Sequence, residues 1–269
     1  KGNPETILKV LDMEKPDVVI LTGDVVTSKP AKEGWKRIVE MMETAGVPFA
    51  VTMGNHDAEN WSEDSIYNYL SKSRLFIGKK GPEALSGTGN YILPVYASDG
   101  TDKINALLYC MDSNDYTADA EKYGNYAWID WGQIAWYREQ SRQYTTKNNG
   151  NPLPALAFFH IGVPEFKHLQ NRPDMYGHLG EGGGFPKINS GMFQSMIEMG
   201  DVMGIFVGHD HDNDYIAQEY GIALGYGRVS GHDAYGDLER GARIIELFED
   251  GRQFDTWIAT PSGKSLAYY

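Results

Sequence analysis

Four short apolar segments of this sequence each lead into side chains that can bind a metal ion. The pairs are residues 18–22 with Asp24, residues 49–53 with Asn55 and His56, residues 155–159 with His160, and residues 204–207 with His209 and His211. The apolar segments are typical of buried strands, and ligands that follow several strands meet at one edge of an open α/β sheet. Each side chain alone could be an ordinary loop or core residue. Their repetition after four segments predicts a metal site.

The order of these motifs resembles the calcineurin-like metallophosphoesterase superfamily. The resemblance rests on Gly23-Asp24, Gly54-Asn55-His56-Asp57, His160 and Gly208-His209-Asp210-His211. Residues 158–166, 208–215 and 240–243 are most similar to the branch related to purple acid phosphatases. The resemblance implies an α/β fold, a two-sheet β-sandwich flanked by helices, within a single domain that spans residues 1–269.

The resemblance also implies a centre of two divalent or trivalent metal ions bridged by Asp24. One ion would be held by Asp24, Asn55, His160 and His209. The other would be held by Asp24, His211 and an Asp-x-His pair on an earlier strand. No such pair stands before Asp24 in this sequence, so we expect the first strand of the fold to be missing from it. A metal-deficient relative that binds phosphate-bearing ligands with little turnover is therefore the alternative to an active enzyme.

His56 and Asp57 are given a catalytic role by the same resemblance. His56 would donate a hydrogen bond to the phosphate or to the leaving oxygen, and Asp57 would orient its ring. The implied reaction is hydrolysis of phosphoric monoesters or diesters by a metal-bound hydroxide. Two cations about 3.5–4 Å apart clamp the phosphate and lower the pKa of bound water toward roughly 7.

The sequence departs from purple acid phosphatases directly after Asp24. Those enzymes bind ferric iron through a tyrosinate a few residues beyond the Gly-Asp motif, whereas residues 25–28 here are Val-Val-Thr-Ser. We therefore expect no purple charge-transfer band. Mn, Fe, Zn and Co all accept mixed Asn, His and Asp ligands, so the identity of the metal stays open.

Composition limits the partners of this chain. Its 269 residues, 41% of them hydrophobic and 23% charged, are typical of a globular protein. The formal net charge of −13 argues against a nucleic-acid surface and disfavours a nuclease of the same superfamily. An acidic protein that acts on phosphate esters needs local positive charge, which bound metal supplies. No apolar stretch approaches the roughly 20 residues of a membrane helix.

The periodicity of apolar residues predicts the elements that must position these side chains. Helical spacing predicts helices that begin near Pro4, around residues 35–42 before Gly46, and over residues 65–75. Strands are predicted at residues 91–96, 104–111, 215–218, 222–224, 243–248 and 256–259. Residues 161–190 are the least regular stretch, either a solvated insertion or a loop that faces the substrate.

Overall fold

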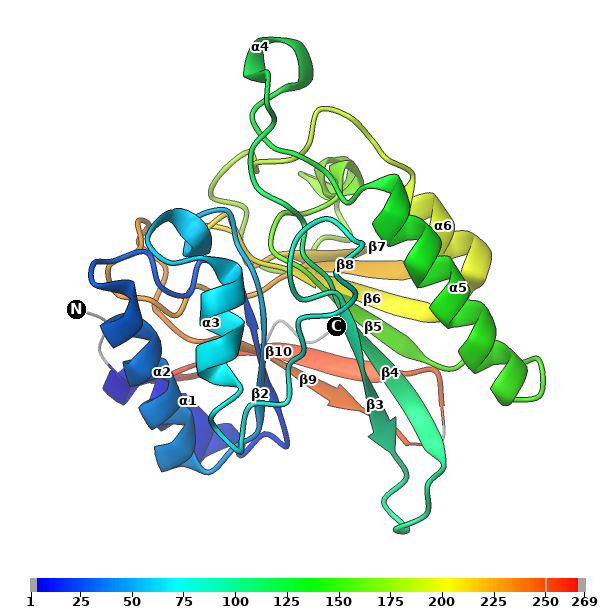
Figure 1. The fold of residues 1–269 in the computed structure, drawn as a ribbon, viewed down its shortest axis with the longest axis horizontal. Coiled ribbons are helices and arrows are strands. Elements are labelled where there is room, and N and C mark those ends of the chain that lie inside the picture. Colours follow the sequence, from blue (N-terminus) through cyan, green and yellow to red (C-terminus); the bar gives the residue numbers. More distant parts are fainter. Residues whose placement is uncertain (1–3, 250, 266–269) are drawn as a thin grey trace.

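A six-stranded mixed sheet forms the centre of the computed structural model, which describes residues 4–249 and 251–265 (Figure 1). Its order is β3-β4-β5-β6-β8-β7, and the four inner strands run parallel between antiparallel edge strands. The strands are β3 Tyr91–Tyr96, β4 Ile104–Cys110, β5 Ala155–Phe158, β6 Val202–Val207, β7 Ile216–Glu219 and β8 Ile222–Tyr226. Polar loops after β5 and β6 therefore emerge at the same edge.

Two smaller sheets cover one face of this sheet. One pairs β1 Val19–Thr22 with β2 Phe49–Thr52 in parallel, and the other joins β9 Ala242–Leu247, β10 Phe254–Thr260 and β11 Gly263–Lys264. The helices on that side are α1 Pro4–Glu14, α2 Ala31–Ala45 and α3 Glu63–Leu70 (Figure 1). The opposite face carries α5 Trp131–Lys147 and α6 Met192–Met199. The predicted α/β arrangement of sheets flanked by helices is confirmed.

The central sheet is buried on both faces, which explains the continuous apolar runs of its strands. In β4, Leu107 and Tyr109 pack in the core beneath α5 and α6, whereas Leu108 and Cys110 pack toward β1 and β2. Every residue of β5 and β6 is buried. Because both faces of these strands are buried, polar side chains of these segments can meet only at the strand ends.

Most predicted elements are present, with small shifts at their ends. α2 ends at Gly46, whose φ of 67° lets the chain turn out of the helix as predicted. The third helix runs over Glu63–Leu70 rather than residues 65–75. It begins at Glu63 because the side chain of Ser62 caps it by accepting a hydrogen bond from Ser65 N–H. The strand predicted at residues 215–218 is β7 Ile216–Glu219.

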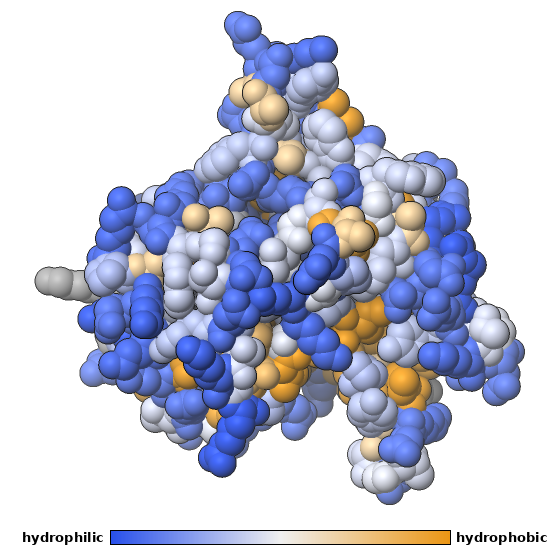
Figure 2. Space-filling view, in the orientation of Figure 1, coloured by the Kyte–Doolittle hydropathy of each residue, from blue (hydrophilic) through white to orange (hydrophobic). Residues whose placement is uncertain are grey.

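The remaining elements are short. α4 Ala120–Tyr123 lies at the tip of a segment that projects from the body (Figure 1), and the 3₁₀ turns are η1 Asp57–Glu59 and η2 Pro164–Leu169. On the face shown in Figure 2, hydrophilic residues predominate and apolar residues reach the surface in separate small groups. Within the described part of the chain, no helix has the length and apolar character required to cross a bilayer.

Asp201 connects the start of β6 to two neighbouring elements. Its carboxylate accepts hydrogen bonds from the hydroxyl of Tyr109 in β4, at 2.8 Å, and from the hydroxyl of Tyr137 in α5. Asp201 is 1% exposed and both tyrosines are completely buried. The contact therefore fixes α5 against the sheet edge from which β6 leads to the polar loop after Val207.

We expect Asp201→Ala to lower the free energy of unfolding by about 2–6 kcal/mol, because two buried hydroxyls lose their acceptor at about 1–3 kcal/mol each. Urea denaturation would measure the change as a lower midpoint. Asp12→Ala, on the exposed side of α1, is the matched control and should stay within about 0.5 kcal/mol of the wild type. Equal midpoints for the two variants would contradict the structural role of Asp201.

Candidate metal centre

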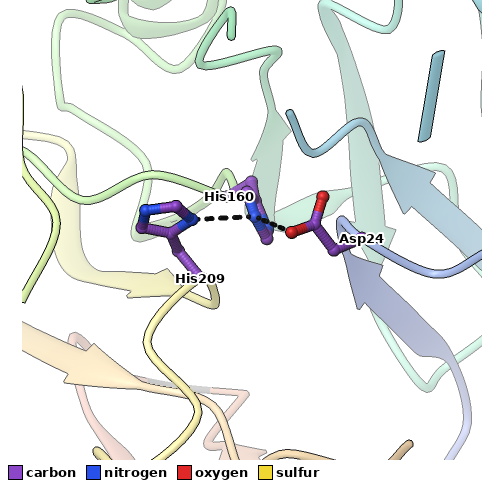
Figure 3. A group of neighbouring side chains, drawn as sticks. All are labelled: Asp24, His160 and His209. Atoms are coloured by element: carbon purple, nitrogen blue, oxygen red, sulfur yellow. Dashed lines mark hydrogen bonds and ion pairs between the residues drawn. The ribbon is translucent and has the colours of Figure 1, made fainter. Parts of the chain in front are cut away.

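Three of the five predicted metal ligands form one cluster at the ends of β1, β5 and β6. The ligand atoms of Asp24, His160 and His209 all lie within 4.8 Å of one another (Figure 3). Nε2 of His160 is 3.0 Å from Asp24 Oδ2 and 3.3 Å from His209 Nδ1. An oxygen and two imidazole nitrogens at this spacing can bind one first-row transition metal ion.

Unusual backbone conformations bring these side chains together. Asp24 has a φ of 51° and His209 a φ of 75°, in the left-handed region that non-glycine residues rarely adopt. Gly23 between β1 and Asp24 must lack a side chain, because a Cβ there would lie 2.5 Å from His160 Nδ1. Each strained residue costs about 1–3 kcal/mol, and such strain clusters at functional sites.

Hydrogen bonds fix the orientation of His160. Its Nδ1 lies 2.7 Å from the carbonyl oxygen of Thr22, which can only accept, so Nδ1 carries a proton. Nε2 is therefore the atom that faces Asp24, as in a histidine ligand held by a backbone carbonyl. Burial alone would lower the pKa of His160, but the hydrogen bond and charge of Asp24 raise it above its usual value.

The electrostatics of the other two members suit metal binding. Burial raises the pKa of Asp24, but the hydrogen bond and charge of His160 outweigh it and bring that pKa to about 2. Burial, together with the nearby charge of His160, lowers the pKa of His209 to about 3. Near neutral pH the cluster thus offers an ionised carboxylate and a neutral imidazole, which are the protonation states that ligate metals.

Asn55 and His211, the remaining predicted ligands, lie outside this three-residue cluster but carry buried atoms that lack a partner. Asn55 Oδ1 and His211 Nδ1 are two of seven side-chain atoms in the described residues that are buried without a hydrogen bond. Buried polar atoms are nearly always satisfied, so two unpartnered polar atoms on predicted ligands fit a site that binds a cation. Burial also lowers the pKa of His211.

Asp57 has a different contact from the one predicted. Its fully buried carboxylate accepts hydrogen bonds from the backbone N–H groups of Val25 at 2.9 Å, Val26 at 3.1 Å and Gly54 at 2.9 Å. These contacts join the loop after β1 to the loop after β2. Burial raises the pKa of Asp57 to about 6 although the hydrogen bonds oppose it.

The ring of His56 is oriented by Glu59 rather than by Asp57, which corrects the prediction. Nδ1 of His56 lies 2.6 Å from Glu59 Oε1, and the two residues flank one 3₁₀ turn. Asp57 faces inward from the same turn and therefore points away from the ring. The three-residue spacing of His56 and Glu59 was a local signal that the sequence analysis did not use.

Tyr116 is a second site residue that sequence reasoning missed. Its hydroxyl lies 2.8 Å from Nδ2 of Asn55, 61 positions earlier in the chain. Its ring stacks on Tyr126, which in turn makes an edge-to-face contact with His209 at 4.6 Å between ring centroids. No local pattern could have found Tyr116, because its place depends on the path of the segment after β4.

Within the irregular stretch of residues 161–190, the glycine-rich segment 182–184 reaches the candidate metal centre. Gly184 N–H donates to Asp210 Oδ1 at 2.8 Å, and a Cβ on Gly184 would lie 2.6 Å from His209 Nε2. Gly184 thus packs against the Nε2 side of the His209 ring, whereas Nδ1 of that ring faces His160. His168, from the same stretch, instead pairs with Glu219 at the surface.

Comparison with known proteins gives one family and several relatives. A model described as calcineurin-like phosphoesterase matches residues 1–213. The chain is 32% identical over 276 residues to a protein of Arabidopsis thaliana named "Probable inactive purple acid phosphatase 29", covering 96% of this chain and 71% of that one. It is 28% identical to "Phosphatase DCR2" of Saccharomyces cerevisiae over 96% of this chain and 48% of that protein.

A solved structure supports the same architecture. A dimetal phosphatase from Danio rerio matches with a TM-score of 0.59 and 14% sequence identity, over 98% of this chain and 87% of that chain. At that identity the likeness concerns the fold alone. It is consistent with the layered α/β arrangement described above.

Asp57→Asn tests the contact between the two loops. The amide places an N–H₂ group against a backbone N–H, so we expect a loss of about 1–3 kcal/mol in the free energy of unfolding. Metal affinity should fall with it, because the loop that carries Asp24 is no longer fixed. Chemical denaturation and calorimetric titration with Mn²⁺ measure the two effects. Unchanged stability in this variant would show that the carboxylate is not the structural link.

Gly184→Ala tests the space behind His209. The added methyl group forces the ring to shift, so we expect Mn²⁺ to bind at least about 10-fold more weakly, as when a partner of a metal ligand is lost. Gly182→Ala is the matched control, because a Cβ at Gly182 meets no atom within 4 Å. The same Mn²⁺ affinity in both variants would contradict the placement of Gly184.

Proposed function

Because the chain belongs to the calcineurin-like phosphoesterase family, we propose that it is a metal-dependent hydrolase of phosphoric esters. The observation that carries this proposal is the cluster of Asp24, His160 and His209, whose ligand atoms lie within 4.8 Å of one another. The orphan atoms of Asn55 and His211 extend the same donor set. The names of the yeast and zebrafish proteins, a phosphatase and a dimetal phosphatase, agree with this reaction class.

In this proposal Asp24, Asn55, His160, His209 and His211 hold two metal ions, of Mn, Fe, Zn or Co. Bound metal would supply positive charge for the phosphoryl oxygens and acidity for the attacking water. Asp24 is suited to the shared position because its two oxygens have different neighbours. Oδ2 faces His160, while Oδ1 accepts the backbone N–H of His56 at 2.8 Å.

His56 would act on the substrate itself. It follows Asn55 directly, and its side chain is 42% exposed. The carboxylate of Glu59 can only accept from Nδ1, so the ring is held with Nε2 as its free polar atom. With Nδ1–H committed to Glu59, Nε2 carries a proton only when the ring is the imidazolium, and in that form Nε2–H would donate a hydrogen bond to a phosphate oxygen or a proton to the leaving oxygen. Glu59 serves as the positioning residue that the sequence analysis assigned to Asp57.

The second candidate is a relative that binds phosphate-bearing ligands with little turnover. The name of the Arabidopsis protein, which includes "probable inactive", favours this alternative. The two candidates share the ligand cluster and differ in whether a phosphate ester is cleaved. Metal binding and turnover must therefore be measured separately on the same preparation.

We expect chelator-treated protein to hydrolyse p-nitrophenyl phosphate only after a metal such as Mn²⁺ is added. His209→Ala should lose at least about 100-fold in turnover and bind less metal by elemental analysis, since even outer-shell losses cost about 10–100-fold. His168→Ala is the matched control, because His168 is exposed and pairs with Glu219. Full activity of His209→Ala would overturn the ligand assignment.

Two further outcomes decide between the candidates. A wild-type protein that binds Mn²⁺ and inorganic phosphate but cleaves no ester would establish the ligand-binding alternative. Comparison of p-nitrophenyl phosphate with bis(p-nitrophenyl) phosphate, which release the same leaving group, would show whether monoesters or diesters are preferred.

A further inference from the structure

Residues 115–127 form an arm that leaves the central sheet after β4 and carries two stacked tyrosines at its base. Two hydrogen bonds close the arm, from Thr117 N–H to the carbonyl of Asn125 at 2.9 Å and from Ala127 N–H to that of Asp115 at 3.0 Å. Tyr116 and Tyr126 pair between them. Figure 1 shows the tip of the arm, with α4, projecting away from the body.

The two tyrosines span the site from one predicted ligand to the candidate proton donor. Their rings stack with centroids 6.0 Å apart at an interplanar angle of 27°. Tyr126 meets the ring of His209 edge to face, at 4.6 Å and 86°. Tyr116 meets the ring of His56 at 6.3 Å and 73°. We call Tyr116 and Tyr126 the tyrosine wall.

The hydroxyl and the ring of Tyr116 have separate surroundings. The hydroxyl accepts a hydrogen bond from Asn55 Nδ2 at 2.8 Å, which directs Oδ1 of the same amide away from the arm and leaves it without a partner. The residue nevertheless remains 46% exposed. A tyrosine needed only for packing would bury its ring, whereas this one presents the ring beside His56.

We propose that Tyr116 serves both the metal and the substrate of the proposed hydrolase. Its hydroxyl is a positioning group that holds the Asn55 amide by its nitrogen, so that Oδ1 is the atom left for the metal. The tyrosine wall receives the organic group of the phosphate ester and favours planar aromatic groups over small aliphatic ones. This inference rests on the proposed function, and it names the substrate class that the site selects.

The positioning role follows from the chemistry of the amide. An amide that rotates by half a turn exchanges its oxygen for an N–H₂ group, which cannot ligate a cation. A metal therefore selects the rotamer with Oδ1 toward it, and in that rotamer Nδ2 donates to the Tyr116 hydroxyl, which holds the amide in place. Loss of the hydroxyl should therefore weaken metal binding by about 10-fold, the lower part of the range for partners of metal ligands.

Binding of non-hydrolysable phosphonates tests the wall without requiring turnover. We expect the Mn²⁺-loaded protein to bind phenylphosphonate about 2- to 10-fold more tightly than methylphosphonate, the range that one aromatic contact contributes. Because both ligands meet the same metal, the ratio of their affinities isolates the organic group. Tyr116→Leu should bring this ratio close to one, and Tyr126→Leu should lower it. Tyr116→Phe keeps the ring and should keep the ratio.

Calorimetric titration with Mn²⁺ tests the hydroxyl separately. Tyr116→Phe should bind Mn²⁺ about 10-fold more weakly than the wild type while its thermal unfolding is unchanged. Tyr96→Phe and Tyr96→Leu are the controls, because Tyr96 is 54% exposed at the end of β3. Both controls should leave the Mn²⁺ affinity and the phosphonate ratio unchanged.

The possible failures can be told apart. An unchanged phosphonate ratio in Tyr116→Leu overturns the wall, and full Mn²⁺ affinity in Tyr116→Phe overturns the positioning role. A wild type that cleaves no ester but shows the expected ratio and affinities would refute the proposed hydrolase and leave the tyrosine wall in place. Turnover by a wild type that shows no phosphonate preference would do the reverse.

Discussion

The candidate metal centre depends on two carboxylates that cross between the loops after β1 and β2. The last paired residues of these strands are Thr22 and Thr52, so the sheet ladder does not hold the chain beyond them. Asp57, in the second loop, accepts backbone N–H groups of the first. Asp24, in the first loop, accepts the backbone N–H of His56 in the second. The exchange fixes both loops as one unit against His160.

The two joined loops stabilise the fold through their hydrogen bonds, but their conformation also costs free energy. A buried carboxylate is costly unless its oxygens are hydrogen-bonded, and Asp57 meets that condition with three backbone donors. Its raised pKa shows that burial still outweighs those bonds. The left-handed conformations of Asp24 and His209 add strain. The fully buried central sheet therefore offsets the free energy that the site requires, and the site lies where that sheet ends.

Sequence alone was sufficient where the signal was local. The apolar segments before Asp24, His160 and His209 coincide with β1, β5 and β6. The structure brings the three side chains together. Gly46 ended its helix for a reason visible in the sequence. The predicted partner of His56 was wrong because the carboxylates of Asp57 and Glu59, in one tight turn, point in different directions. Tyr116 could not be found, since its contact with Asn55 depends on how a whole arm is folded.

The negative net charge of the chain makes a local source of positive charge necessary at the candidate site. At a net charge of −13, binding of a phosphate group as proposed would require positive charge concentrated at the site. The arginines that follow the His209 loop are committed to the fold: Arg228 pairs with Asp214, and Arg240 and Arg243 donate to backbone carbonyls. In the proposed function, bound metal and His56 would be the groups that meet the phosphoryl oxygens. A metal attracts any phosphate ester alike, so in the proposed hydrolase the discrimination between esters would fall to contacts with the organic group, which is the role we propose for the tyrosine wall.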